Sequence, residues 1–495
     1  MKKTRFLKQW LFAVSYLLLS TMLTAQKHEA VILPGNYPDP SITVAENGYY
    51  MVTSSGLDNP SLPIWYSTDL QHWQQVGSGL LNQVGDVWAP DIQYYQHKWY
   101  IYFTALTKKG AENFVITAEK PEGPWSSPLK LEVTGIDPGH IADDKGNRYL
   151  YMSDGYVAKL DESGTKVITP QQKVYAGWKI PETWSIECFC LEGPKLFFRD
   201  GYYYLVAAQG GTSGPPTSHM AVAARSGNIN GPWENAPNNP VVHSTGRANA
   251  WWSKGHGTVF QAKDHQWYMI YHAYQKDLHT LGRQVLISSV DWQKNGWFTV
   301  GERSLFPDAK GIAFRDDFET PQLPSHYVFN NDSAVNRLSF HKGNLLLKAH
   351  GTNSTNTNPL FVTPKNEAYQ VTTKLSLETD SIEAGLLLYY NNNFHVGLAL
   401  KKDGIYQVVK GSTWKVSGLY HNKTAWLRLA NDHNTINYYY SFDGIKWQKV
   451  DLSHDISGYN TNTLGGFRSV RAGIYTAGKG VAAFDFFTYD LLEVK

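Results

Sequence analysis

Cysteine is almost absent from the chain, which has only Cys188 and Cys190 among its 495 residues. Two cysteines cannot build a framework of disulfides. One residue separates them, so in an extended strand both side chains point the same way, and a mutual disulfide would be strained. A metal or nucleophile site at this pair lacks a matching histidine cluster, and we expect two buried free thiols instead.

An excess of charge of one sign is also missing. The chain has 45 Lys and Arg against 43 Asp and Glu, and no run of one sign stands out. This balance argues against nucleic acid and anionic membrane surfaces as partners.

Long hydrophobic runs are missing after the first 25 residues. A basic start is followed by an apolar run from Trp10 to Leu23 and then by the small residue Ala25. This order is typical of a signal peptide, which we place at residues 1–25. No later run is long enough to span a bilayer. No cysteine lies near the cleavage point, so a lipid anchor is not indicated. We therefore expect a secreted or periplasmic protein.

Aromatic residues, by contrast, are abundant and follow a repeat. Five times, at intervals of about fifty to sixty residues, a turn signal precedes an aromatic residue or pair that opens an apolar strand. The turns lie at 46–48, 96–98, 146–148, 199–201 and 264–266. Short strands bounded by turns, with a repeat of this length, are typical of four-stranded propeller blades. We predict an all-β chain with a five-bladed β-propeller over residues 26–308.

A second domain is expected over residues 313–495, because the repeat stops after Pro307 and the chain is too long for a single core. Alternating strands are predicted at short intervals, separated by Asn-rich or Asp-Gly turns. They lie at 369–377, 385–390, 394–400, 405–409, 426–429 and 436–442. This spacing predicts a β-sandwich.

Chemistry is expected where the innermost strands of the blades meet at the propeller axis. Reading back about eight to twelve residues from each aromatic turn gives one polar residue per repeat. These residues are Asp39, Asp91, Asp137, Glu192 and His256. Carboxylates gathered around one axis repel each other unless a ligand, a metal or a shared proton offsets the repulsion, so the pattern favours a functional site.

The motifs around these positions resemble glycoside hydrolase family 43, in the same order, across roughly residues 31–300. They are Pro38-Asp39-Pro40-Ser41, Trp88-Ala89-Pro90-Asp91, Ile136-Asp137-Pro138, Glu192-Gly193-Pro194 and Gly255-His256-Gly257. The resemblance implies hydrolysis with inversion, with Asp39 as general base, Glu192 as general acid and Asp137 as the residue that tunes and orients the acid. Inversion needs about 6.5–9.5 Å between base and acid, which different blades around one channel can supply.

Further site residues follow from the same resemblance. His256 resembles a channel histidine that contacts an axial metal ion or water cluster, with a hydrogen-bonded core histidine as the alternative. Arg283 resembles a substrate-contacting arginine, unless it is a solvated strand residue. Trp88 forms a wall of the sugar pocket or packs in the core. For Asp91 the family assigns no chemistry, and we expect a structural role.

The second domain resembles the concanavalin-like sandwich often attached to this family. Asp317 and Asp485, near its two ends, are candidates for a shared structural Ca²⁺, with exposed loop carboxylates as the alternative. No cofactor is expected for the chemistry itself.

The resemblance implies an exo-acting hydrolase that removes terminal β-xylosyl or α-L-arabinofuranosyl residues from plant polysaccharides or oligosaccharides. Three alternatives stay open: a galactan- or galactofuranose-directed hydrolase of the same fold, a retaining fructan-type hydrolase, and a carbohydrate-binding propeller without catalysis. The fructan reading lacks its Asn-Asp-Pro-Asn signature. The sequence carries no signal for an oligomeric state.

Overall fold

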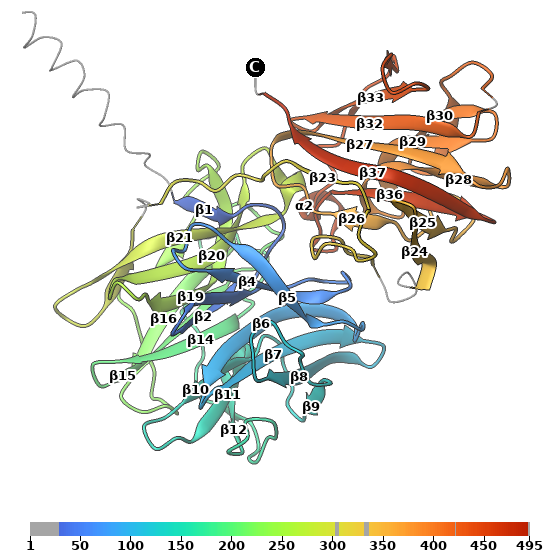
Figure 1. Ribbon diagram of the computed structural model, residues 1–495. Helices are drawn as coiled ribbons and strands as arrows, with labels where there is room; N and C mark the ends of the chain where they lie inside the picture. The colour runs from blue at the N-terminus through green and yellow to red at the C-terminus, as the bar shows by residue number, and fades with distance from the viewer. Residues whose placement is uncertain (1–28, 302–305, 331–335, 421, 494–495) are drawn as a thin grey trace, which may run out of the picture.

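The computed structural model describes residues 29–301, 306–330, 336–420 and 422–493, which form two β domains joined side by side (Figure 1). The predicted signal peptide lies outside the described residues. Within those residues, no helix is long and apolar enough to cross a membrane.

The first domain is a propeller of five blades, as predicted. Each blade has a meander of four antiparallel strands, and the innermost strands β2, β6, β10, β14 and β19 contact each other around the axis. Blade 1 contains β2 (Ser41–Ala45), β3 (Gly48–Val52), β4 (Ser61–Ser67) and β5 (Gln74–Leu80). Blade 2 contains β6 (Asp86–Tyr95), β7 (Lys98–Thr107), β8 (Gly110–Ala118) and β9 (Leu129–Leu131). Blade 3 contains β10 (Gly139–Ala142), β11 (Arg148–Met152), β12 (Tyr156–Leu160) and β13 (Gln172–Lys173), with the 3₁₀ turn η1 (Ser153–Gly155).

The last two blades carry extra strands. Blade 4 contains β14 (Glu192–Arg199), β15 (Tyr202–Gln209), β16 (Met220–Ser226), β17 (Glu234–Asn235) and β18 (Val242–His243). Blade 5 contains β19 (Trp251–Gln261), β20 (Trp267–Gln275), β21 (Arg283–Trp292), β22 (Phe298–Val300) and the 3₁₀ turn η2 (His279–Leu281). Its outer strand β1 (Ala30–Leu33) comes from the start of the described chain and pairs with β21. This pairing closes the ring, because β1 and β19 to β21 come from opposite ends of the repeat region.

The aromatic residues after the five turns begin the second strand of every blade, and they pack between blades. Tyr50 of β3 meets Trp99 of β7 edge to face, with ring centroids 4.7 Å apart. Aromatic pairs in this geometry contribute attraction beyond their buried area. The aromatic repeat in the sequence thus marks the residues that pack one blade against the next.

The second domain is a sandwich of two antiparallel sheets over one apolar core, again as predicted. One sheet contains β23 (Phe314–Asp316), β24 (Leu338–His341), β25 (Asn344–Lys348), β27 (Ala368–Leu377), β32 (Thr424–Asp432), β33 (Thr435–Ser441), β34 (Gln448–Lys449), β35 (His454–Asp455) and β37 (Val481–Leu491). The other contains β26 (Leu360–Val362), β28 (Ile382–Asn391), β29 (Phe394–Lys401), β30 (Gly404–Val409), β31 (Ser412–Lys415) and β36 (Arg471–Gly478).

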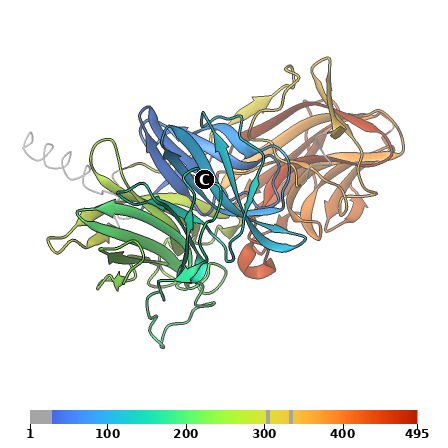
Figure 2. The same ribbon diagram turned by 90° about the horizontal axis from the view of Figure 1, so that it is seen from below.

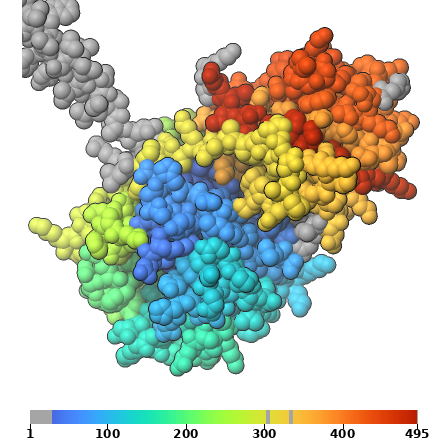
Figure 3. All heavy atoms as spheres, in the orientation of Figure 1, coloured from blue at the N-terminus to red at the C-terminus, as the bar shows by residue number. Residues whose placement is uncertain are grey.

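The sandwich packs directly against the propeller (Figures 2 and 3). Asn59 and Phe329 exchange backbone hydrogen bonds of 2.7 and 2.9 Å across the junction. A partly buried ion pair joins Arg471 of β36 to Asp58. The short helix α2 (Thr461–Leu464) lies on the propeller side of the sandwich (Figure 1). The loop after α2 therefore reaches the mouth of the propeller axis.

Candidate active site

The mouth of the axis is formed by one backbone kink in each blade. Residues at this position have left-handed φ angles: 57° at Asp39, 32° at Ala89, 59° at Asp137, 59° at Gly193 and 52° at His256. Side chains other than glycine seldom adopt this conformation, and such residues cluster at functional sites. The kink explains why these residues face one another at the mouth.

A second ring lies two residues deeper and is structural. Its members are Ser41, Asp91, Gly139, Lys195 and Thr258. Asp91 accepts a hydrogen bond of 2.9 Å from Ser41 Oγ, and its carboxylate lies 3.1 Å from the buried Lys195 Nζ. Asp91 is thus one step below the mouth, where its charge is paired, and blade 2 presents Ala89 instead.

Asp39 is buried and held as an anion. Its Oδ1 lies 3.1 Å from Arg283 Nη1 and 3.3 Å from His256 Nδ1, and Ser54 Oγ donates to Oδ2 at 2.5 Å. Burial alone would raise the pKa of Asp39, but the guanidinium group of Arg283 holds it well below its usual range. The Asp39 N–H donates to His272 Nδ1 at 3.1 Å, which fixes the kinked backbone. Ser54 and His272 carry no signal in the sequence, because they lie on a second strand or the loop after one rather than in the axial motifs.

Asp137 and Glu192, in contrast to Asp39, have raised pKa values. Burial and the charge of Asp39 raise the pKa of Asp137 to about 7, although Lys195 lowers it. Burial, Asp137 and Asp39 together raise the pKa of Glu192 well above its usual range. Because Asp137 and Glu192 repel each other as anions, one of them keeps a proton near neutral pH.

His256 is buried, and its Nε2 has no hydrogen-bond partner among the described residues. Burial lowers the pKa of His256 to about 3, so the ring is neutral. Ligand atoms of His256, Asp137 and Glu192 lie within 4.8 Å of one another. These three side chains could hold a metal ion if Glu192 were a carboxylate, because carboxyl groups bind metal ions in their deprotonated form.

The cavity over these residues has walls from both domains. Trp88 and Ile136 of the propeller line it together with Phe467 and Arg468 from the loop after α2. Thr212, in the Gly-rich loop 210–216, also lines it. Trp88 and Arg283 thus both line this cavity, and their contact with substrate stays a prediction. Phe467 and Arg468 had no signal in the sequence, because no sequence pattern shows which loop of a second domain meets the first.

The predicted calcium ligands of the sandwich lie in two ion pairs. Asp317 pairs with Arg315 at 2.6 Å, and Asp485 pairs with Lys374 at 2.9 Å. Neither belongs to a group of three ligating side chains within the described part of the chain. A calcium ion shared by Asp317 and Asp485 stays a prediction and would compete with these two cations.

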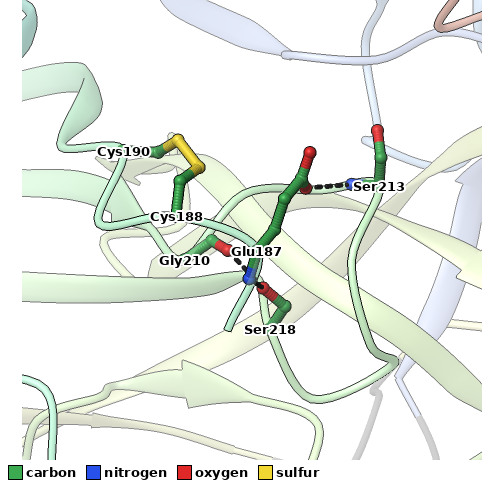
Figure 4. Close-up of a disulfide and its surroundings, with 6 residues drawn as sticks. All are labelled: Glu187, Cys188, Cys190, Gly210, Ser213 and Ser218. Carbon is green, nitrogen blue, oxygen red and sulfur yellow. Dashed lines mark hydrogen bonds between the residues drawn. A yellow bond between two sulfur atoms is a disulfide. The ribbon is translucent and has the colours of Figure 1, made fainter. Parts of the chain in front are cut away.

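The expectation of buried free thiols is wrong. Cys188 and Cys190 form a disulfide beside Glu187 (Figure 4). Their Cα atoms are 5.3 Å apart, within the range that a disulfide spans. The prediction assumed an extended strand, but β14 begins only at Glu192, and a left-handed φ of 37° at Cys190 bends the chain. Both cysteines are half-buried rather than buried.

The axial pocket of this five-bladed propeller combines a carboxyl group with a lowered pKa and one with a raised pKa, the kind of pair that an inverting glycoside hydrolase uses as base and acid. The family model for glycosyl hydrolases family 43 matches residues 28–298, and that for the beta-xylosidase C-terminal concanavalin A-like domain matches residues 315–490. The first match spans more than half of the chain, and the protein belongs to glycoside hydrolase family 43.

Named relatives match nearly the whole chain. A xylosidase/arabinosidase of Butyrivibrio fibrisolvens is 28% identical over 521 residues, covering 94% of this chain and 98% of that protein. A non-reducing end α-L-arabinofuranosidase of Bacteroides ovatus is 26% identical, covering 93% and 94%. The crystal structure of a xylan β-1,4-xylosidase from Bacillus halodurans superposes with a TM-score of 0.83 at 28% identity, covering 94% of this chain and all of that one.

Proposed function

We propose that this hydrolase removes terminal β-xylosyl or α-L-arabinofuranosyl residues from plant polysaccharides or oligosaccharides, with inversion at the anomeric carbon. Asp39 is the general base, Glu192 the general acid, and Asp137 the residue that tunes and orients the acid. The observation that carries the proposal is the opposite protonation of Asp39 and Glu192 around one pocket. An inverting hydrolase needs this division of roles before substrate binds.

The reaction proceeds in one displacement. Asp39 accepts a proton from a water molecule, and the water oxygen attacks the anomeric carbon from one face of the sugar. Glu192 donates its proton to the glycosidic oxygen as the bond to the leaving group breaks. Arg283 and Ser54 keep Asp39 charged and oriented before the reaction. Asp137, as an anion, favours the protonated form of Glu192.

Two observations support a terminal pentose as substrate. The sandwich residues Phe467 and Arg468 line the pocket beside the propeller residues, and a wall from a second domain favours binding of a chain end over the middle of a chain. The relatives that match almost the full length are named as xylosidases and arabinosidases. Neither observation separates the two sugars, because xylosyl and arabinofuranosyl groups present similar hydroxyl patterns.

The proposal includes export. Residues 1–25 are a signal peptide by sequence, which implies secretion or a periplasmic location. N-terminal sequencing of the mature protein from culture medium or periplasm should read from about Gln26. A mature chain that retains residues 1–25 in the cytoplasm would contradict this part.

Sugar release from xylo-oligosaccharides, arabinoxylan and arabinan tests the main proposal, with Asp39→Asn as the matched variant. We expect one pentose to be released, its new anomer to be inverted in NMR spectra taken during early turnover, and release to be lost in Asp39→Asn. Retention of configuration would reject the base role of Asp39. Release of galactose or fructose alone, or binding without turnover, would replace the substrate assignment.

A further inference from the structure

The five residues before the proposed acid form a turn closed by a disulfide. Glu187 N and Cys188 N both donate to Gly210 O, at 3.1 and 3.4 Å, and Phe189 O accepts from Gly210 N at 3.2 Å. Leu191 O accepts from Asp154 N of blade 3 at 2.7 Å. The turn is thus joined to the end of β15 and to the neighbouring blade.

Cys190 is the one bent residue of this turn. Its φ of 37° is left-handed, although it is not a glycine and does not belong to strand β14. A residue other than glycine keeps such a conformation only where the surrounding structure enforces it. The bond to Cys188 supplies that constraint, two residues before Glu192.

The sandwich domain supports the same turn from outside. Asn462 of α2 donates to Ser213 O at 3.0 Å and to Gly214 O at 3.3 Å. Ser213 N in turn donates to Glu187 Oε2 at 2.7 Å, and the disulfide lies beside this contact (Figure 4). A continuous set of contacts therefore runs from the sandwich through the 210–216 loop to the turn.

We propose that the turn Glu187–Leu191, closed by the Cys188–Cys190 disulfide and supported by Asn462, positions Glu192 for proton donation to the leaving group. The inference rests on the proposed role of Glu192 as the acid. The cysteines and Asn462 are positioning residues, since none of them lines the substrate pocket. Through Asn462 the sandwich acquires a role in the chemistry besides closing the pocket.

Loss of the disulfide should slow proton donation from Glu192 to the leaving group more than the other steps of the reaction. Without it, Cys190 can relax to an ordinary φ, which redirects the chain entering β14 and moves the carboxyl group of Glu192. A misplacement of about 1 Å in a reacting group can cost on the order of 100-fold in rate. The rate should not fall for substrates whose leaving group departs without a proton, because their hydrolysis does not need the general acid.

The experiment compares kcat/KM on two substrates, xylobiose and 2,4-dinitrophenyl β-xyloside, or their arabinofuranosyl counterparts if arabinose is the sugar released. For Cys188→Ser/Cys190→Ser we expect about a 10- to 100-fold loss on the disaccharide and less than about 3-fold on the aryl glycoside. Asn462→Ala should give a smaller loss with the same selectivity, about 2- to 5-fold. Thermal melting confirms that each variant is folded.

A rescue variant tests the backbone argument. Cys188→Ser/Cys190→Gly also lacks the disulfide, but glycine adopts a left-handed φ without a steric penalty. We expect it to recover part of the activity on the disaccharide. Equal losses on both substrates, or no loss on either, would overturn the inference and leave the disulfide a stabilising element only.

Glu192→Gln separates this inference from the proposed function. It should lose far more activity on the disaccharide than on the aryl glycoside. If it does and the cysteine variants do not, the positioning role alone is wrong. If Glu192→Gln loses both activities equally, the acid assignment fails first, and the inference fails with it.

Discussion

The propeller and the sandwich are both β domains with apolar packing, but they differ in what they bury. The propeller buries charged side chains at its axis, among them Asp39, Asp137, Lys195 and Arg283. The sandwich also buries Arg337, Glu383 and Arg471, but the space between its two sheets holds a continuous cluster of aliphatic and aromatic side chains. Blades that converge on an axis force polar residues of five strands together, whereas two facing sheets can exclude them. Chemistry therefore belongs to the propeller, and the sandwich acts at its rim.

The largest effect should follow from breaking the charge arrangement at the axis. Arg283→Met removes the cation that holds Asp39 ionised, so the pKa of Asp39 rises and the acidic limb of the kcat/KM profile moves to higher pH. We expect kcat/KM at the optimum to fall about 100-fold or more, within the range for acid–base catalysis. Arg283→Lys keeps the charge and should keep the limb closer to wild type. An unchanged acidic limb in Arg283→Met would contradict the role of Arg283.

The second effect is on stability, because we expect Asp137 to lower the stability of the fold at alkaline pH although catalysis needs it. In the folded protein the pKa of Asp137 is raised to about 7, above its value in the unfolded chain. The contribution of Asp137 to the free energy of unfolding is therefore fully present below the unfolded pKa and is lost as pH rises through about 7. Asp137→Asn does not titrate. At pH 8 the Tm of Asp137→Asn should exceed that of wild type, by about 2–4 °C for each kcal/mol gained in the free energy of unfolding. At pH 4 the two Tm values should be similar. The activity of Asp137→Asn should nevertheless fall. A lower Tm than wild type at pH 8 would indicate that Asp137 stabilises the fold as an anion.

A smaller effect is expected from the sandwich side of the pocket. Phe467 is half-exposed and its ring lies 5.6 Å from the guanidinium carbon of Arg283. Phe467→Ala should raise KM about 10-fold with little change in kcat, because an apolar wall binds ground state and transition state alike. Leu419→Ala, at an exposed residue outside the pocket lining, is the control. A fall in kcat with unchanged KM would place Phe467 in the chemistry and weaken the contrast between the domains.

The smallest effect concerns calcium in the sandwich. An ion at Asp317 and Asp485 has to displace Arg315 and Lys374, so its net stabilisation should be at most a few degrees. Melting of the chelator-treated protein, with and without added Ca²⁺, measures it, and Lys374→Met should strengthen the response. No response in either protein would reject the calcium site.

The fold was predictable because its signals are local. Turn residues followed by an aromatic pair mark each blade in the sequence, since those aromatics pack one blade on the next. Asp39, Asp137 and His256 were predictable for the same reason, as one polar residue falls at the same place in three repeats, and Glu192 lies one residue before that place in blade 4. Asp91 departed from this register by two residues, because the kink in blade 2 falls at Ala89.

The remaining features required contacts between distant parts of the chain. Ser54 and His272 support Asp39 from other strands and carry no motif of their own. The disulfide was misjudged because its geometry depends on a left-handed residue that extended-strand reasoning does not supply.

By itself, the sequence determined the two β domains, the order of the blades and the carboxylates that meet at the axis, because each depends on a short pattern repeated along the chain. Only the tertiary structure decided which carboxyl group holds a proton, since a pKa depends on burial and on charges brought from other blades. It also decided that the loop after α2 reaches the pocket, because the packing of two domains depends on surfaces that no local pattern encodes.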